Sequence, residues 1–544
     1  MPRDFEIDLG PDGPGVYRLL RAGLKRTIRD FEAARTQLQA AQEARLKAIV
    51  GLMSGTEFGR AHGISRVRSL ADLQAAAPIR TYADLQPWFD RIADGQRKVL
   101  TQEPVQMLLE TSGTTGRPKL LPCTRTWAES VAAAQAIWVL RMVADHPEIR
   151  DGQALTVVSP AVHTHTAGGV PVGSNTGRMH ARQPWWVRSR YPIPDAVYAL
   201  KPSELKWYAL LRFALQSNIS TITTANPSTI LLMCRLLQEW RLPLSRDLAD
   251  GTLRHGPARY LGRWERFSLE RRLKKVSPPA DFRPAHIWPL KLVNCWKGGP
   301  AQYFTARLPQ ALGAAVPVRE VGITASEGYF ALPLGDDWPG GVMWPLGHVM
   351  EFVGDDGRAR FGWQLDQGER VRLVITTEAG LFRYDLKDTL EVVGHAGQLP
   401  VLRFVGKTGR WLNATGEKVT EAQVSAAMQQ AVESVGLPTV GGFSARTHWA
   451  DVPYVELAVE GCPSRAAADL AAAFDRALGG ENIEYDAKRE SARLAPPRVL
   501  VVPDGTFARW RKGRVAAGAP DGQVKDPILS VSDVEWDRVM AARA

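Results

Sequence analysis

The stretch Thr-Ser-Gly-Thr-Thr-Gly-Arg-Pro-Lys at residues 111–119 constrains the fold of this chain more than any other. Two glycines free its backbone to curl, while hydroxyls, amides and Lys119 gather donors and positive charge suited to polyphosphate. It is not a Walker A loop, because Pro118 precedes the lysine. An apolar stretch at 105–109 comes before it, and a helix is expected from about Trp127. The order of strand, loop and helix predicts a phosphate cradle, with a plain polar turn as the alternative.

Strand and helix patterns alternate downstream of this loop. A buried strand is expected at 154–158, followed by a helix at 203–217 with one apolar stripe. A β-branched strand at 219–224 leads to Asn226-Pro227, where Asn and Pro suit the cap and first position of another helix. Such alternation predicts a mainly parallel sheet that helices cover on both faces.

The chain of 544 residues is too long for one hydrophobic core. One helix is expected over 16–49, and short strands dominate from 342 to 404. A capping box at Thr420–Gln423 opens the first helix of a smaller α+β unit. The predicted class is α/β, a large multi-sheet N-terminal domain with a β-rich subdomain and a small mobile α+β C-terminal domain. The predicted boundaries are an N-terminal domain at 1–405, a hinge at 406–410 and a C-terminal lid domain at 411–544.

Composition narrows the class of partner. Lys and Arg number 68 against 57 Asp and Glu, a formal net charge of +11 that favours anionic ligands such as ATP. The basic residues are interspersed with acids and form no nucleic-acid module, so we expect no nucleic-acid partner. No apolar run reaches 18 residues, and acids stand near the N-terminus, so we expect a cytoplasmic protein with no membrane span. Neither a zinc site nor a disulfide scaffold is indicated, because four cysteines lie far apart.

Acidic and basic residues in later segments could complete a nucleotide site. Glu327 follows a predicted strand, and near a triphosphate it would bind Mg²⁺; a surface turn is the alternative. Asp388 could accept both ribose hydroxyls, or simply end a hairpin strand. Lys418 or Lys525 could stabilise charge on the α-phosphate, although most lysines are solvated surface charges.

Together and in this order, these segments resemble the acyl-adenylate-forming (ANL) superfamily. Within it the chain is most similar to the auxin-responsive Gretchen-Hagen-type acyl acid amido synthetases. The similarity extends over nearly the whole chain. The motifs that carry it are Pro78-Ile-Arg-Thr-Tyr82, residues 111–119, Trp296-Lys-Gly-Gly299, Ala325-Ser-Glu-Gly-Tyr-Phe330, Phe382-Arg-Tyr384 with Asp388, Gly505-Thr-Phe507, Gly518-Ala519 and Gln523-Val-Lys525.

The resemblance implies a set of nucleotide-binding residues. Mg²⁺ would be bound by Glu327 and the ribose by Asp388, while Lys418 and Lys525 would be the catalytic lysines of the C-terminal domain. The remaining implied contacts with ATP are Thr111, Ser112, Gly113, Thr114, Thr115, Gly116 and Lys119 on the phosphates, Gly298 and Gly299 near adenine, and Ser326, Tyr329 and Lys407.

The resemblance also implies a two-step ligase reaction. A small carboxylic acid would attack MgATP to give an acyl-adenylate, and an amine, expected to be an amino acid, would then form an amide. Coenzyme A as acceptor, or a non-catalytic nucleotide sensor, are the alternatives. The acid pocket is expected from residues 127–143, 160–190 and 323–330, with Trp185 and Trp186 as candidate walls or core residues.

Several positions depart from the family pattern. Lys387 replaces the glycine expected just before Asp388, and Ile323 stands where an aromatic residue usually flanks the acid-containing motif. Lys407 and Gly409 occupy hinge positions where Arg and Asp are frequent. These hinge departures are the support for the sensor alternative.

Overall fold

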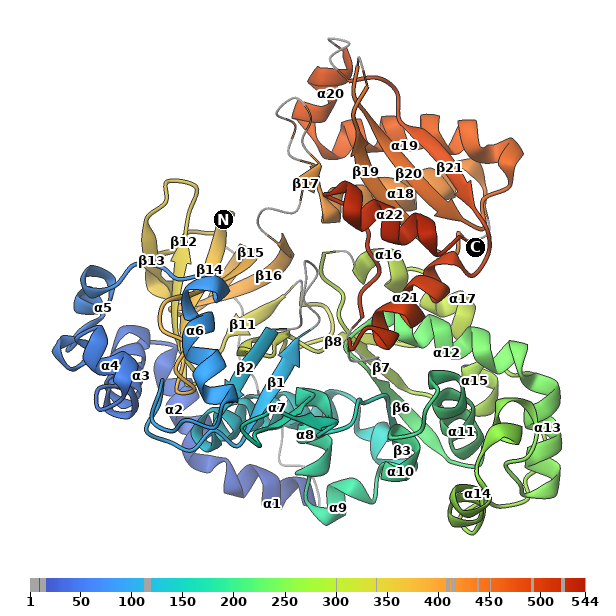
Figure 1. Ribbon diagram of the computed structural model, residues 1–544, viewed down its shortest axis with the longest axis horizontal. Helices are drawn as coiled ribbons and strands as arrows, with labels where there is room; N and C mark the ends of the chain where they lie inside the picture. The colour runs from blue at the N-terminus through green and yellow to red at the C-terminus, as the bar shows by residue number, and fades with distance from the viewer. Residues whose placement is uncertain are drawn as a thin grey trace. The chain divides into compact units, whose positions relative to one another are not determined.

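A computed structural model describes residues 9, 16–111, 119–299, 301–338, 340–407, 411–412, 414, 417, 419–437, 440–450, 452–490, 494–519 and 524–543. The chain divides into two compact units (Figure 1). The N-terminal unit contains residues 1–296 and 308–404, and the C-terminal unit contains residues 297–307 and 405–544. The short segment 297–307 thus groups with the C-terminal unit, whereas the sequence had assigned it to the N-terminal domain. The hinge and the mobility of the lid remain predictions.

The N-terminal unit begins with helices that pack on its β-rich sheet. The prediction of a single helix over 16–49 is wrong, because the helical conformation is interrupted at Leu24 and again between Ala34 and Leu38. The buried Gln42 side chain donates from Nε2 to the carbonyls of Pro345 and His348, at 2.8 and 3.0 Å. These helices are α1 (Val16–Gly23), α2 (Lys25–Ala34), α3 (Leu38–Met53), α4 (Glu57–Ala61), α5 (Leu70–Ala76) and α6 (Tyr82–Ala93).

A hairpin carries the glycine-rich segment. Strands β1 (Met107–Thr111) and β2 (Lys119–Cys123) are antiparallel neighbours, with Thr111 opposite Lys119. The predicted strand–loop–helix order is therefore wrong, since a second strand intervenes before α7 (Arg125–Asp145). The apolar run after Lys119 is long enough to form a strand that pairs with β1. Thr124 then caps α7, because its side chain accepts a hydrogen bond from the Trp127 amide at 3.3 Å. Strands β5 (Pro171–Gly173) and β4 (Thr164–His165) complete this sheet, in the order β2-β1-β5-β4.

The predicted parallel sheet is confirmed. Strands β3 (Gln153–Thr156), β6 (Ile219–Thr223), β7 (Leu292–Cys295) and β8 (Val318–Glu320) follow that order and pair in parallel. After β7 come two short helices, α16 (Ala301–Thr305) and α17 (Leu308–Leu312). The other helices of this region are α8 (Asn175–Ala181), α9 (Trp185–Arg188), α10 (Asp195–Tyr198), α11 (Ser203–Leu215), α12 (Pro227–Glu239), α13 (Arg241–Asp250), α14 (Arg263–Glu270) and α15 (Pro284–Ile287).

The β-rich subdomain is also confirmed, as an eight-stranded sheet in the order β13-β12-β14-β15-β16-β11-β10-β9. One hydrophobic core joins this sheet to the N-terminal helices and the hairpin, and a second core surrounds the parallel sheet. The strands are β9 (Ile323–Ala325), β10 (Gly328–Leu332), β11 (Gly341–Met343), β12 (Val349–Val353), β13 (Ala359–Phe361), β14 (Arg370–Thr376), β15 (Tyr384–Ala396) and β16 (Leu399–Lys407).

The C-terminal unit is the predicted α+β fold. Its three-stranded sheet has the order β19-β20-β21, and the capping box of Thr420 and Gln423 is present. Its elements are β17 (Trp411–Leu412), β18 (Val419–Thr420), α18 (Glu421–Val435), β19 (Phe443–His448), β20 (Tyr454–Glu460), α19 (Ala467–Glu481), α20 (Ile483–Glu490), β21 (Arg498–Val502), α21 (Thr506–Ala516) and α22 (Asp533–Ala541).

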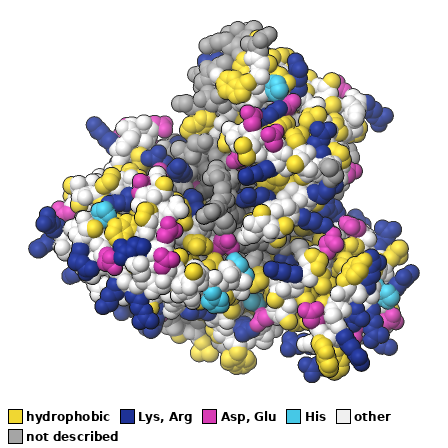
Figure 2. All heavy atoms as spheres, in the orientation of Figure 1, with side chains coloured by type: hydrophobic (Ala, Val, Ile, Leu, Met, Phe, Trp, Pro, Cys, Tyr) yellow, Lys and Arg dark blue, Asp and Glu magenta, His cyan; other side chains and the backbone are white. Residues whose placement is uncertain are grey.

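Two surface properties bear on the partner classes. In the described part of the chain, none of the helices combines the length and apolar character needed to cross a bilayer. Figure 2 shows basic side chains interspersed with acidic and apolar ones on the visible face, instead of one continuous basic stripe. All four cysteines are buried, and none of them forms a disulfide.

Candidate active site

The two ends of the glycine-rich segment are fixed by the hairpin. Thr111 and Lys119 pair at the ends of β1 and β2. The Nζ atom of Lys119 lies 5.1 Å from the centre of the Tyr82 ring, close enough for a cation–π interaction. The Tyr82 hydroxyl accepts from the Leu120 amide at 3.0 Å. Lys119 is therefore anchored beside the segment predicted to hold phosphate. Five of the predicted phosphate contacts lie outside the described residues: Ser112, Gly113, Thr114, Thr115 and Gly116.

Three predicted elements of the site converge on Tyr384, the first residue of β15. Burial raises the pKa of the Tyr384 phenol, and the charge of Glu327 raises it further, followed by Tyr82 and Asp388. These groups all raise the pKa of one phenol, although they come from α6, the β9–β10 turn and β15. Tyr384 belongs to a motif that the sequence singled out, but its place between these groups follows only from the fold.

Backbone pairing holds the segment before α6 against β15. The Arg80 amide donates to the Arg383 carbonyl at 2.8 Å, and the Asp385 amide donates to the Arg80 carbonyl at 2.8 Å. This parallel bridge places Tyr82 and Tyr384 in the same region. The motif at 78–82, far from β15 in sequence, is thereby part of the candidate site.

Glu327 and Ser326 form the turn between β9 and β10, where both are half-buried. The indole Nε1 of Trp127, on α7, donates to the Glu327 carbonyl at 2.8 Å and so fixes this turn. Among the described residues no group of three or more His, Cys, Asp or Glu could hold a metal ion. A carboxylate oxygen suits Mg²⁺, so Glu327 fits an ion whose other ligands are phosphate oxygens and water.

Tyr329, predicted as a nucleotide contact, is buried in β10. Its hydroxyl donates to the Val321 carbonyl, and burial raises the pKa of its phenol. The hydroxyl is therefore committed to the fold. We expect Tyr329 to support the turn beside Glu327 instead of donating to the nucleotide.

Asp388 lies in β15 and is 6% exposed. The register between β14 and β15 shifts across this region, and Lys387 adopts a φ of +59°. The Lys387 amide donates to Asp385 Oδ1 at 2.8 Å. The family pattern places glycine here, and a left-handed φ is the conformation that favours glycine. The lysine therefore occupies a strained position immediately before the predicted ribose ligand.

The remaining predicted residues belong to the C-terminal unit. Gly298 and Gly299 follow β7, and Gly299 has a φ of +56°. Lys407 ends β16, and Lys525 is exposed. Their contacts with nucleotide remain predictions, as does that of Lys418, which lies outside the described residues.

The three segments expected to form the acid pocket meet at Trp127. The ring of this residue, 1% exposed, lies 5.4 Å from Cζ of Arg178, while its Nε1 bonds the Glu327 carbonyl. Trp185 is 82% exposed and so forms no closed wall, and the side chain of Trp186 is not among those described. The importance of Arg178 was missed because a lone arginine in sequence carries no signal of burial.

A buried carboxylate next to the glycine-rich segment was also missed. Glu110 is 8% exposed in β1, and His163 Nε2 lies 2.8 Å from its Oε2. The approach is close enough for an ion pair. Burial raises the pKa of Glu110, and the facing histidine opposes that shift.

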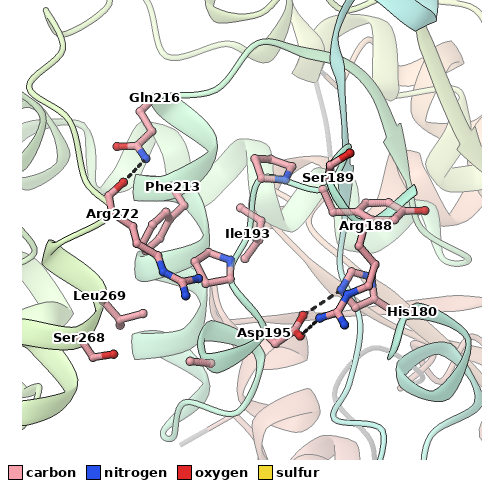
Figure 3. A pocket seen from close by; sticks show the side chains of 14 residues that line it. His180, Arg188, Ser189, Ile193, Asp195, Phe213, Gln216, Ser268, Leu269 and Arg272 are labelled. Carbon is pink, nitrogen blue, oxygen red and sulfur yellow. Dashed lines mark hydrogen bonds and ion pairs between the residues drawn. The ribbon is translucent and has the colours of Figure 1, made fainter. Parts of the chain in front are cut away.

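A separate cavity of about 540 Å³ is lined by His180 at the end of α8 and by residues from the segments that follow it. Its lining includes His180, Arg188, Asp195 and Arg272. His180 and Arg188 both bond Asp195, as Figure 3 shows. None of the predicted nucleotide-binding residues lines this cavity, so it is distinct from the candidate active site.

Comparison with known families decides the lineage of the chain. Residues 27–318 match the GH3 family N-terminal domain, residues 342–407 the GH3 family central domain, and residues 422–533 the GH3 family C-terminal domain. The first match alone covers more than half of the chain. This protein belongs to the GH3 family. The resemblance seen in the sequence is thus confirmed.

Individual GH3 relatives and solved structures agree. A probable indole-3-acetic acid-amido synthetase GH3.2 of Oryza sativa subsp. japonica is 26% identical, over 90% of this chain and 88% of its own. The structure of AtGH3.15 acyl acid amido synthetase in complex with 2,4-DB has a TM-score of 0.81 at 17% identity, covering 94% of this chain and 95% of that chain. A 2-hydroxyisobutyryl-CoA ligase in its postadenylation state has a TM-score of 0.53 at 13% identity, covering 93% of this chain and 91% of that chain. These structural similarities establish the fold, and the predicted fold class is confirmed.

Proposed function

We propose that this GH3-family protein is an ATP-dependent ligase that activates a small carboxylic acid as acyl-AMP and transfers the acyl group to an amino acid amine. The observation that carries the proposal is the convergence of Tyr82, Glu327 and Asp388 on Tyr384, with Lys119 over the Tyr82 ring. A cation, a carboxylate for Mg²⁺ and a carboxylate for ribose are the groups that MgATP requires. The amido synthetase names of its relatives support the same reaction.

In the first step, an oxygen of the acid attacks the α-phosphorus of ATP. A new oxygen–phosphorus bond forms, the bond between the α- and β-phosphates breaks, and pyrophosphate leaves. Lys119 offsets charge on the phosphates, and Asp388 holds the ribose. Glu327 would hold Mg²⁺, which would neutralise phosphate oxygens. Positioning and charge stabilisation supply the rate, so no serine nucleophile is required.

In the second step, the amine nitrogen attacks the acyl carbon. The nitrogen–carbon bond forms, the bond between acyl carbon and AMP oxygen breaks, and the nitrogen loses its proton. The products are an amide and AMP. Lys418 and Lys525 belong to the C-terminal unit, and we propose that this unit brings a lysine to the α-phosphate for the first step.

The test measures acid-dependent exchange of pyrophosphate into ATP across a panel of acids, followed by mass spectrometry of products with amino acids. Lys119→Ala and Glu327→Gln should each lower exchange about 100-fold without unfolding the protein. Glu129→Gln is a matched control, because Glu129 is an exposed residue of α7 that forms an ion pair with the exposed Arg125.

Each negative result identifies a different error. Exchange at the wild-type rate in both site variants would contradict the placement of the site. Exchange that yields a thioester with coenzyme A, but no amide, would show that the acceptor is wrong. No exchange with any acid would favour a nucleotide sensor.

A further inference from the structure

Arg178 is a buried cation without a carboxylate partner in the part of the chain that the structure describes. It lies on α8 and is 5% exposed. Its Nε and Nη2 donate to Asn175 Oδ1, at 3.2 and 2.9 Å, and its guanidinium packs over the Trp127 ring. Burial lowers the pKa of Arg178; the Cys123 thiol opposes this shift and Arg182 adds to it.

Two other buried arginines of the same unit, Arg319 and Arg383, are neutralised by carboxylates, and the fully buried Arg212 donates instead to three backbone carbonyls. Arg319 Nη1 lies 2.8 Å from Asp145 and 2.6 Å from Asp336. Arg383 donates to both oxygens of Glu351, at 2.9 and 2.8 Å. Arg178 has neither arrangement, since its hydrogen bonds share one acceptor, Asn175 Oδ1. A guanidinium removed from water with so few partners is destabilising by several kcal/mol, so the contrast points to an anion supplied by a ligand.

The position of Arg178 places that anion beside the candidate active site. Trp127 contacts the Arg178 guanidinium with its ring and the Glu327 carbonyl with its Nε1. Arg178 and the predicted metal turn are therefore separated by one indole. The anion would lie in the region where the three segments of the predicted acid pocket meet.

The hairpin argues that this anion differs from the phosphate chain that Lys119 would hold. The positive charge of Arg178 opposes the rise that burial causes in the pKa of the Cys123 thiol, at one end of β2. Lys119 stands at the other end of the same strand. Cys123 and Lys119 are four positions apart, about 13 Å along an extended strand at roughly 3.3 Å per residue. The reacting carboxylate is also a poor match, because it loses its charge when it becomes an acyl-adenylate. A permanent cation suits a carboxylate that stays charged throughout both steps.

We infer that Arg178 binds a second substrate carboxylate, one that is not activated. This inference rests on the proposed ligase function. The carboxylate comes either from an acid with two carboxyl groups or from the amino acid acceptor. Arginine matches a carboxylate with two parallel hydrogen bonds, so the contact adds specificity as well as affinity.

The experiment compares substrates that differ by one carboxylate. The acid arm measures pyrophosphate exchange with benzoate against isophthalate and with hexanoate against adipate. The amine arm measures amide formation from one acyl-adenylate with alanine against alaninamide. Each arm is run with the wild-type protein, Arg178→Gln, Arg178→Lys and Arg182→Gln. Arg182 is an exposed arginine one turn further along the chain, which makes it the matched control.

In one arm, the wild-type protein should prefer the carboxylated substrate by about 10–100-fold in kcat/KM. Arg178→Gln should abolish that preference through a higher KM, Arg178→Lys should retain part of it, and Arg182→Gln should retain all of it. The arm that responds identifies the source of the carboxylate. If Arg178→Gln lowers activity equally for both members of every pair, or changes neither, the residue is structural and the inference is wrong.

A binding measurement separates this inference from the ligase proposal. Calorimetric titration with isophthalate, adipate and alanine reports the contact without turnover. Binding to the wild-type protein that is lost in Arg178→Gln would support the carboxylate site even if no acid drove exchange. No difference between the proteins in titration or in either kinetic arm would overturn it. Thermal unfolding of each variant shows whether it has folded.

Discussion

The hydrogen bond from Trp127 to the Glu327 carbonyl can be tested with an internal control. Helix α7 carries a second tryptophan, Trp138, whose Nε1 donates to the Glu320 carbonyl at 3.0 Å. Both indoles are buried and both bond the backbone of a glutamate. Only the first of these bonds supports the turn that carries the predicted metal ligand. Trp127→Phe and Trp138→Phe therefore remove the same chemistry from two places.

The expected loss of stability is similar in the two variants. Each loses one buried hydrogen bond, about 1–2 kcal/mol, and each leaves a similar small space where the indole was. The catalytic effects should differ. A misplacement of about 1 Å at a reacting group can lower a rate about 100-fold. We expect Trp127→Phe to lower kcat/KM for MgATP by about 10–100-fold, and Trp138→Phe to change it less than about threefold.

Urea unfolding measures the first quantity, and acid-dependent pyrophosphate exchange with titrated Mg²⁺ measures the second. Loss of exchange in Trp127→Phe should be greatest at low Mg²⁺, because the turn positions Glu327. Wild-type exchange in Trp127→Phe at every Mg²⁺ concentration, together with the expected loss of stability, would refute the role of this turn. Equal loss of exchange in both variants would show a general effect of weakening α7.

Two further predictions concern stability. Lys387→Gly should raise the free energy of unfolding, measured in urea, by about 0.5–1 kcal/mol. The substitution removes a left-handed backbone strain of roughly 1–2 kcal/mol, and the greater chain entropy of glycine in the unfolded state offsets about 0.5–1 kcal/mol of that gain. Lys387→Ala should show no such gain, and a less stable glycine variant would contradict the argument. Glu378→Gln should lower the free energy of unfolding by about 3 kcal/mol at pH 7, because the fully buried Glu378 bonds His348 at 3.0 Å and pairs with Arg45. Burial alone would raise the pKa of Glu378, but the His348 hydrogen bond and charge, then Arg45, lower it overall. The contribution of Glu378 to stability is therefore complete above about pH 4.3 and is lost as the pH falls through its lowered pKa. The difference in free energy of unfolding between wild type and variant should therefore shrink in acid. A difference that grew in acid would be inconsistent with this pairing.

The order of motifs along the chain predicted the lineage, the parallel sheet and the β-rich subdomain. Periodic apolar residues specify a face locally, as in α11, so those elements were found. The hairpin was missed because the apolar residues after Lys119 read equally as the approach to a helix. The convergence on Tyr384 could not be predicted, nor could the burial of Arg178 away from the carboxylates of the described residues, since both depend on which distant segments exclude water from them.

The attachment of the first helices to the β-rich sheet has a consequence for synthesis on the ribosome. Gln42 bonds the Pro345 carbonyl, 303 residues further along, and the Leu38 amide bonds the Gln398 side chain, 360 residues further along. At roughly 5–20 residues per second, α3 waits roughly 15–70 s before those partners emerge. Its apolar face is exposed to other nascent chains during that interval. Fragments that end before about residue 400 should therefore aggregate, and recovery of the full-length protein should depend on chaperones that shield this helix.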